Sequence, residues 1–249
     1  MHLLQIENLK KTYRSFNPKG IETKALRGIN FTVENGEFIA IMGPSGCGKT
    51  TLLNLIAGID VATEGRIIIN GIDIMNMEKN AISRFRRDHM GIVFQDFNLI
   101  DSLNVKENIM VPGILKKTPT DEILNAVTKL SKMAGIEDLL EKRIDELSGG
   151  QQQRVAICRA LFNDPALILA DEPTGNLDSL SARQVMEYLK QINQGEKKTI
   201  LLVTHDAMSA SYCDRVIFLK DGRIESLLPR NESKDYYSLI LSELLKHGR

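Results

Sequence analysis

The sequence contains no long apolar run. Its apolar stretches, such as residues 38–42, 166–170 and 200–203, fall far short of the roughly 20 residues that span a bilayer. Residues 1–11 also lack the charged leader, apolar stretch and small-residue cleavage site of a secretory signal. These absences argue against a membrane-spanning or exported chain, and we expect a cytoplasmic location.

Cysteine is scarce, and neither sign of charge is in excess. The three cysteines, Cys47, Cys158 and Cys213, are an odd number at scattered spacings, which favours free thiols in a reducing compartment over a disulfide framework or a zinc site. Lys plus Arg and Asp plus Glu each number 32, so the formal net charge is zero. Because nucleic-acid binding depends mainly on phosphate contacts, this balance argues against a nucleic-acid partner.

What the sequence does contain is an alternation of short apolar runs with amphipathic stretches. Its 249 residues, 43% of them hydrophobic, are enough to bury a sizeable core. Period-two alternation predicts strands and 3.6-residue periodicity predicts helices. We expect strands at 3–9, 31–33, 38–42, 67–69, 72–74, 167–170, 200–203 and 216–220, and helices at 49–57, 151–163, 181–194 and 232–246. Strands that alternate with helices imply parallel pairing and an α/β fold.

Residues from about 97 to 147 differ in character, because helical patterns dominate there and are interrupted by Pro112 and Pro119. This is typical of a helical subdomain inserted into a sheet. The last predicted helix has its apolar residues on one stripe: Tyr236, Leu239, Ile240 and Leu244. We therefore predict a single domain, 1–249, with a core at about 1–96 and 151–228, a helical subdomain at about 97–150 and a C-terminal helical extension at about 229–249.

A glycine-rich loop stands between a predicted strand and a predicted helix. Its residues are Gly43, Pro44, Ser45, Gly46, Cys47, Gly48, Lys49 and Thr50. Glycines let backbone N–H groups turn inward around a phosphate, and the following helix directs the positive end of its dipole at the same anion. Lys49 would then reach the β- and γ-phosphates, and the Thr50 hydroxyl would ligate magnesium. The alternative, a flexible glycine turn, is disfavoured by the strand–loop–helix setting.

Two acids, Asp171 and Glu172, directly follow the predicted strand 167–170. Ligands of open α/β sheets bind at the carboxyl ends of the strands. We expect Asp171 to hold magnesium through water, and Glu172 to orient and deprotonate an attacking water. A buried strand followed by acids is by itself more often a solvated sheet edge. The glycine-rich loop reverses that preference.

A second anion-binding pattern lies ahead of a predicted helix. It consists of Leu147, Ser148, Gly149, Gly150 and Gln151. A serine and two glycines at a helix start form an anion site. One ATP has only one γ-phosphate, which the lysine of the first loop already contacts. Two phosphate sites on one chain therefore suggest a nucleotide shared between two chains, and the alternative is an ordinary capped helix.

Four further residues are candidates, each with a structural alternative. Gln95, after the apolar run 91–94, would touch magnesium and the attacking water, or it is a solvated residue at a strand end. His205 would contact the γ-phosphate, or it is a satisfied structural histidine. Tyr13 would stack on adenine or belong to the core, and Asp178 would cap a helix or contact a partner subunit.

In this order, the motifs resemble those of the ABC ATPase family over essentially the whole chain. The glycine-rich loop resembles the Walker A motif, residues 167–171 resemble Walker B, and residues 147–151 match the signature motif. The single-residue matches are the adenine-stacking Tyr13, the Q-loop Gln95, the catalytic Glu172, the D-loop Asp178 and the switch histidine His205. The nucleotide site implied also includes Thr51. The implied fold is a P-loop NTPase with a mixed sheet core, an N-terminal antiparallel β part and an inserted helical subdomain.

The resemblance implies an enzyme that hydrolyses ATP with Mg²⁺ as a head-to-tail, ATP-dependent homodimer. Each ATP would lie between one copy's Lys49, Thr50, Gln95, Asp171, Glu172 and His205 and the other copy's Ser148 and Gly150. An integral membrane permease would dock near residues 95–103, in the cleft between core and helical subdomain. It would hold the chain on the inner face of the cell membrane.

Residues 94–109 and 204–218 resemble the bacitracin and lantibiotic resistance subgroup, within the branch of macrolide-export and lipoprotein-release ATPases. The resemblance thus implies export of, or resistance to, peptide antibiotics. The alternatives are a lipoprotein-release or macrolide-export complex, and a sensing complex that signals through the permease to a histidine kinase. A rival class is a soluble ABC ATPase of cluster assembly. Repair ATPases carry coiled-coil insertions and ribosomal ones a second ATPase unit, which this sequence lacks.

Overall fold

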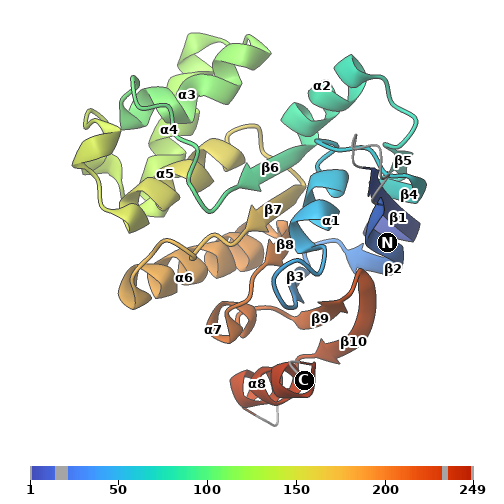
Figure 1. Ribbon diagram of the computed structural model, residues 1–249. Helices are drawn as coiled ribbons and strands as arrows, with labels where there is room; N and C mark the ends of the chain where they lie inside the picture. The colour runs from blue at the N-terminus through green and yellow to red at the C-terminus, as the bar shows by residue number, and fades with distance from the viewer. Residues whose placement is uncertain (1, 15–21, 232–234, 248–249) are drawn as a thin grey trace.

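The computed structural model describes residues 2–14, 22–231 and 235–247. Its central sheet contains β3 (Phe38–Met42), β6 (Met90–Val93), β7 (Leu167–Asp171), β8 (Thr199–Val203), β9 (Arg215–Lys220) and β10 (Arg223–Pro229). These strands lie in the order β10-β9-β3-β8-β7-β6 (Figure 1). All neighbours are parallel except β10, which pairs antiparallel with β9. Parallel pairing brings the carboxyl ends of β3, β6, β7 and β8 to one edge of the sheet.

Helices connect these strands. They are α1 (Lys49–Ile56), α2 (Lys79–His89), α3 (Val105–Lys116), α4 (Thr120–Ala134), α5 (Gly149–Leu161), α6 (Ser179–Glu196), α7 (Ala207–Ala210) and α8 (Tyr236–His247), with 3₁₀ turns at Glu137–Leu139 and Ile144–Glu146. Helices α3, α4 and α5 lie together between β6 and β7 in sequence, at the upper left of Figure 1. Among the described residues, none of the helices combines the length and apolar character needed to cross a bilayer.

Both faces of the central sheet are covered, which explains why its middle strands are uninterrupted apolar runs. All five residues of β3 are buried. Phe38, Ala40 and Met42 belong to a core shared with helices α3 to α8, whereas Ile39 and Ile41 belong to a second core shared with α1 and the N-terminal strands. Polar residues are therefore confined to the places where these strands end.

A second, antiparallel sheet packs against α1. It contains β1 (His2–Arg14), β2 (Glu22–Glu34), β4 (Glu64–Ile69) and β5 (Ile72–Asp73) in the order β2-β1-β4-β5. The predicted hairpin around Asn70-Gly71 is formed by β4 and β5. The two long strands extend well beyond the predicted 3–9 and 31–33, because their pairing continues through bulged register shifts that interrupt the simple alternation.

The expected mixed sheet, antiparallel β part and helical insertion are all present, but one local expectation was wrong. Pro112 does not interrupt a helix and lies inside α3. Ile109 and Gly113 beside it are buried, with Gly113 against the Phe162 ring, and this packing holds the helix through the proline. Pro119, by contrast, occupies the N-cap of α4.

The C-terminal helix α8 packs its predicted stripe on the core. Tyr236 and Ile240 are buried there, with Leu239 and Leu244 half-buried beside them. The Tyr236 hydroxyl donates to the Leu228 carbonyl at 2.9 Å. Residues 232–234 of the predicted helix lie outside the described residues, as do 1, 15–21, 248 and 249 of the predicted domain. The sequence patterns did not predict α2, α7 or β10.

Alanine substitutions at two glycines should change the stability of the protein in opposite directions and so test the packing. A Cβ at Gly91 in β6 would lie 2.6 Å from the Ala160 carbonyl oxygen of α5, whereas Gly195 in α6 has nothing within 4 Å among the described residues. We expect Gly91→Ala to lower the free energy of unfolding by about 1–3 kcal/mol through overpacking. Gly195→Ala should raise it by about 0.4–1 kcal/mol, because alanine favours a helix. Urea unfolding midpoints measure both, and equal shifts would contradict the packing described.

Candidate nucleotide-binding site

The loop of residues 43–48 bends from the end of β3 into α1. Gly48 has a φ of 108°, and a Cβ there would lie 2.7 Å from the Ala25 carbonyl oxygen, so the turn requires glycine. Gly46 has a φ of 78° and no described atom within 4 Å of its Cβ position. The loop therefore presents backbone to open space, beside a cavity of about 340 Å³ that Lys49, Thr50 and Thr51 help to line.

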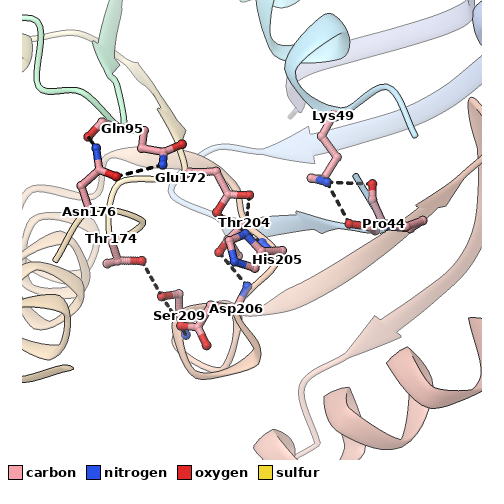
Figure 2. A network of polar contacts seen from close by, with 11 residues as sticks. Pro44, Lys49, Gln95, Glu172, Thr174, Asn176, Thr204, His205, Asp206 and Ser209 are labelled. Carbon is pink, nitrogen blue, oxygen red and sulfur yellow. Dashed lines mark hydrogen bonds and ion pairs between the residues drawn. The ribbon is translucent and has the colours of Figure 1, made fainter. Parts of the chain in front are cut away.

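The Lys49 side chain folds back over this loop. Its ammonium group donates to the carbonyl oxygens of Gly43 at 2.8 Å and Pro44 at 3.0 Å (Figure 2). Lys49 is 9% exposed, so a largely buried positive charge sits beside the cavity with two neutral carbonyl oxygens as its hydrogen-bond partners. A phosphate oxygen would be a stronger partner for that charge. Cys47 faces inward instead of into the cavity, and burial raises the pKa of its thiol, which keeps it protonated.

The two acids after β7 differ in their surroundings. Asp171 lies at the end of the strand, and burial, followed by the neighbouring charge of Glu172, raises the pKa of its carboxyl. The Glu172 carboxylate lies 2.9 Å from Nδ1 of His205 and accepts from the His205 backbone N–H at 3.3 Å. Because an ionised carboxylate only accepts hydrogen bonds, Nδ1 must carry the proton. Glu172 and His205 therefore stand together at the sheet edge as an oriented pair (Figure 2).

The oxygen atoms around Asp171 are of the kind that ligates a hard cation. Its Oδ1 is buried and has no hydrogen-bond partner among the described residues. The Thr50 side chain lies near the same carboxyl and acts to lower its pKa. Among the described residues, no group of three His, Cys, Asp or Glu gathers to hold a metal by protein ligands alone. One carboxylate and one hydroxyl near the cavity of the glycine-rich loop match Mg²⁺, which takes few protein oxygens and completes its shell with phosphates and water.

Gln95 is held by a residue that the sequence did not single out for the site. Its Nε2 donates to Oδ1 of Asn176 at 3.1 Å, and Nδ2 of Asn176 donates back to the Gln95 carbonyl at 3.2 Å and to Asp96 at 2.9 Å (Figure 2). A second polar pair, Thr174 and Ser209 at 3.1 Å, joins the same loop to α7. The segment after Glu172 is thus tied to both neighbouring strand ends.

Tyr13 lies at the end of β1, close to α1, and is 42% exposed. Its hydroxyl donates to Asp60 at 2.8 Å, and the Thr51 side chain lies nearby. Lys11 binds the other Asp60 oxygen at 2.7 Å and places its ammonium 4.7 Å from the centre of the Tyr13 ring. Burial acts to raise the pKa of Asp60, but the hydrogen bonds from Lys11 and Tyr13 outweigh it and leave that pKa lowered. One ring face is therefore occupied by a cation, and the ring's orientation is fixed.

The signature residues lie apart from this cavity. Ser148 caps α5 and forms a capping box with Gln151. Gly149 and Gly150 start the helix against Leu177 and Ser181, and none of these residues lines the cavity beside Lys49, Thr50 and Thr51. Asp178 caps α6 by accepting from the backbone of Leu180 and Ser181 and from the Ser181 hydroxyl, which is the main cause of its lowered pKa.

The structure thus gathers the loop, Lys49, Thr50, Asp171, Glu172 and His205 along one sheet edge and leaves Ser148 to Gln151 elsewhere on the chain. Sequence reasoning missed Lys11, Asp60 and Asn176. Lys11 stands two positions before Tyr13, hence on the same face of a strand, which would have been a usable signal. The other two are brought in by the fold, and no local pattern marks them.

Comparison with known proteins gives matches along most of the chain. A sequence model of the family described as ABC transporter matches residues 26–175. The chain is 50% identical to the uncharacterized ABC transporter ATP-binding protein YvcR of Bacillus subtilis, over 98% of this chain and 94% of YvcR. It is 42% identical to the bacitracin export ATP-binding protein BceA of Halalkalibacterium halodurans (93% and 90% covered). It is also 42% identical to the lipoprotein-releasing system ATP-binding protein LolD 1 of Rhodopseudomonas palustris (89% and 98% covered).

A solved structure also matches this chain over most of its length. The dimeric post-hydrolysis state of the ATP-binding cassette MJ0796 of Methanocaldococcus jannaschii, bound to ADP and Pi, superposes with a TM-score of 0.83. The identity is 40%, and the match covers 92% of this chain and 99% of that chain. This likeness confirms the expected fold class.

The largely buried carboxyl of Asp171, whose Oδ1 has no hydrogen-bond partner among the described residues, predicts a pH-dependent cost in stability. A carboxyl whose folded pKa is raised adds stability below its unfolded pKa and loses it as pH rises through the folded value. Asp171→Asn removes that loss. We expect the variant to melt a few degrees above the wild type at pH 7.5, about 2–4 °C for each kcal/mol recovered, with the gain shrinking towards pH 4. Thermal unfolding without nucleotide measures this. Asp101→Asn, at an exposed position, should change little at either pH, and a variant gain that grew towards pH 4 would contradict the account.

Proposed function

Since the chain belongs to the ABC transporter family, as an ATP-binding subunit and an ABC-type ATPase, we propose that two copies close head to tail on two ATP molecules to drive a membrane permease. The observation that carries this proposal is the separation of two phosphate-binding sets. Lys49 and its loop stand at the start of α1, whereas Ser148 starts α5, whose first turn packs on Leu177 and Ser181. In a head-to-tail pair, each copy's Ser148 and Gly150 would close on the other copy's ATP.

On nucleotide binding, phosphate oxygens would replace some hydrogen-bond partners that lie within the chain. Lys49 would leave the two loop carbonyls for β- and γ-phosphate oxygens, and the backbone of residues 43–48 would surround the β-phosphate. The free face of Tyr13 would stack on adenine. Lys11 on the other ring face and Asp60 on the hydroxyl would keep that ring in place.

Hydrolysis would rest on the Glu172 carboxylate. It would accept a proton from a water aimed at the γ-phosphorus, while His205 holds the carboxylate by its Nδ1–H and faces the γ-phosphate. Gln95 would leave Asn176 to orient the same water. Catalysis on this account is mainly positioning together with charge stabilisation by Lys49 and the partner copy's helix start.

Magnesium would be held by Thr50, Asp171 and Gln95, and when bound it would neutralise phosphate charge. The unpartnered Oδ1 of Asp171 supports this assignment, because a buried anionic oxygen without a donor needs a cation. Its carboxyl would be ionised by that cation despite the pKa raised in the nucleotide-free chain.

The permease would dock beside residues 95–103, where the core meets the helical subdomain of about residues 97–150. Ile100 is exposed there, and Phe97 and Leu99 are half-buried. A short amphipathic helix of the permease could cover these side chains. Docking would hold the chain at the inner face of the cell membrane.

For the substrate, we favour export of, or resistance to, cell-wall-directed peptide antibiotics. The support is the resemblance of residues 94–109 and 204–218 to that subgroup and the likeness to a bacitracin export protein. The equal identity to a lipoprotein-releasing protein keeps lipoprotein release, or macrolide export, as the second candidate. A complex that reports the antibiotic to a histidine kinase would use the same ATPase chemistry.

Glu172→Gln should separate ATP binding from hydrolysis. It keeps the side-chain shape but removes the base and one negative charge near the γ-phosphate, so closure is favoured and exit from it is blocked. We expect hydrolysis to fall by at least about 100-fold and an ATP-dependent dimer to accumulate in size-exclusion chromatography.

The matched control adds Ser148→Arg to the same protein. A bulky side chain at the shared phosphate site should return the double variant to monomer although ATP still binds. If Glu172→Gln stays monomeric at saturating ATP, with and without the permease, the shared-site proposal fails.

Deleting the gene from its host should lower the inhibitory concentrations of bacitracin or lantibiotics severalfold. Resistance should return with the wild-type gene and not with Lys49→Ala, because the phenotype depends on ATP turnover. Unchanged values for these peptides, together with macrolide sensitivity or a lipoprotein-sorting defect, would move the chain to the second candidate.

A further inference from the structure

Helix α5 carries a buried polar side chain that the mechanism above does not use. Gln153, in the second turn, is 0% exposed, and its Nε2 donates to the carbonyl oxygens of Pro173 at 2.7 Å and Phe94 at 3.2 Å. Because carbonyl oxygens only accept, the amide nitrogen must face them, and this fixes the orientation of the carboxamide. Gln153 thus joins α5 to two segments that are 79 residues apart in sequence, 94 and 173.

Those two carbonyls adjoin the residues proposed to act on water. Phe94 directly precedes Gln95 at the end of β6, and Pro173 directly follows Glu172 at the end of β7. Glu172 has a φ of 48°, a left-handed conformation that is uncommon for a side chain of this kind and that persists only where neighbours enforce it. The bond from Gln153 is one of the enforcing contacts on this turn.

The same helix also holds the far side of the Gln95 loop. Arg159 donates to the carbonyl oxygens of Phe97 at 2.9 Å and Asn98 at 2.7 Å. Both of those residues have positive φ values, 58° and 50°. Gln95 is therefore bracketed by two side chains of α5, and movement of α5 would carry this loop with it.

The carboxamide of Gln153 is only partly satisfied by the fold. Its Oε1 is buried and has no hydrogen-bond partner among the described residues. An apolar side chain of the same length would avoid this orphaned acceptor, but it would also lose the two bonds donated to the Phe94 and Pro173 carbonyls. The distinctive contribution of the amide is therefore the alignment of these two backbone segments.

We propose that Gln153 is a positioning residue for ATP hydrolysis, setting the Gln95 and Glu172 backbones relative to α5. The proposal rests on the function proposed above. Ser148 caps the same helix, so closure of that helix start on the partner copy's ATP would pull on the hydrolysis residues of its own chain through Gln153. Hydrolysis would then follow closure and not precede it.

The test compares Gln153→Met with a matched control, Asn193→Leu. Asn193 in α6 is 5% exposed, and its Nδ2 also bridges two backbone carbonyls, those of Gly36 at 2.7 Å and Lys198 at 2.9 Å, away from the nucleotide cavity. Both substitutions keep side-chain size and remove the same number of donated bonds. For Gln153→Met we expect kcat to fall about tenfold or more, with the KM for ATP within about twofold of the wild type. Asn193→Leu should keep kcat with a comparable loss of melting temperature.

Two further measurements separate positioning from structure. Gln153→Met combined with Glu172→Gln should still form the ATP-dependent dimer, because closure needs only the phosphate contacts. Gln153→Glu should have a reduced kcat at pH 8, where an ionised carboxylate cannot donate a hydrogen bond. As the pH falls, the carboxyl is protonated and can donate again, so kcat should recover relative to the wild type measured at the same pH. This second variant carries the test if Gln153→Met fails to fold.

A wild-type kcat in Gln153→Met would overturn the proposal. So would a fall in kcat that is matched by a weaker KM for ATP, by less dimer and by a lower melting temperature. A pH-independent Gln153→Glu would overturn it as well. Failure of Glu172→Gln alone to dimerise would instead refute the shared ATP site, and the present inference would fall with it.

Discussion

The central constraint is burial of the parallel sheet on both faces. Strands β3 and β8 are buried over their whole length, so charged side chains are admitted only where strands end. Parallel pairing sends those ends to the same edge, which places Lys49, Glu172 and His205 near one another although they are far apart in sequence. The position of the site is thus a consequence of the hydrophobic core, and the chemistry follows from which polar residues come next.

At that edge, most polar side chains have hydrogen-bond partners within the chain. Lys49 binds loop carbonyls, Gln95 binds Asn176, and Glu172 binds His205. Each of these partners is replaceable by a phosphate, a cation or a water, and one buried oxygen of Asp171 has no partner at all among the described residues. Binding of ATP therefore costs few hydrogen bonds and relieves one unfavourable burial, which is how a preorganised site can bind a highly charged ligand.

Much of this could be predicted from sequence, because the glycine-rich loop, the acids after β7 and the cap at Ser148 are local patterns. What escaped prediction depends on tertiary packing. Pro112 is accommodated by burial of its neighbours, and β10 pairs only because β9 is already in the sheet. The role of Asn176 arises from a segment 81 residues away, and that of Gln153 from segments 59 and 20 residues away, so no short window of sequence displays them.

The central claim is that each ATP site takes Lys49 from one copy and Ser148 from the other. Mixing two inactive variants, Lys49→Ala and Ser148→Arg, tests it most directly, because a mixed dimer would hold one doubly damaged site and one intact site. Since only a mixed dimer contains an intact site, the account predicts single-turnover ATP hydrolysis in the mixture well above that of either variant alone. A mixture that stays as inactive as either variant alone, although mixed dimers form, would contradict it.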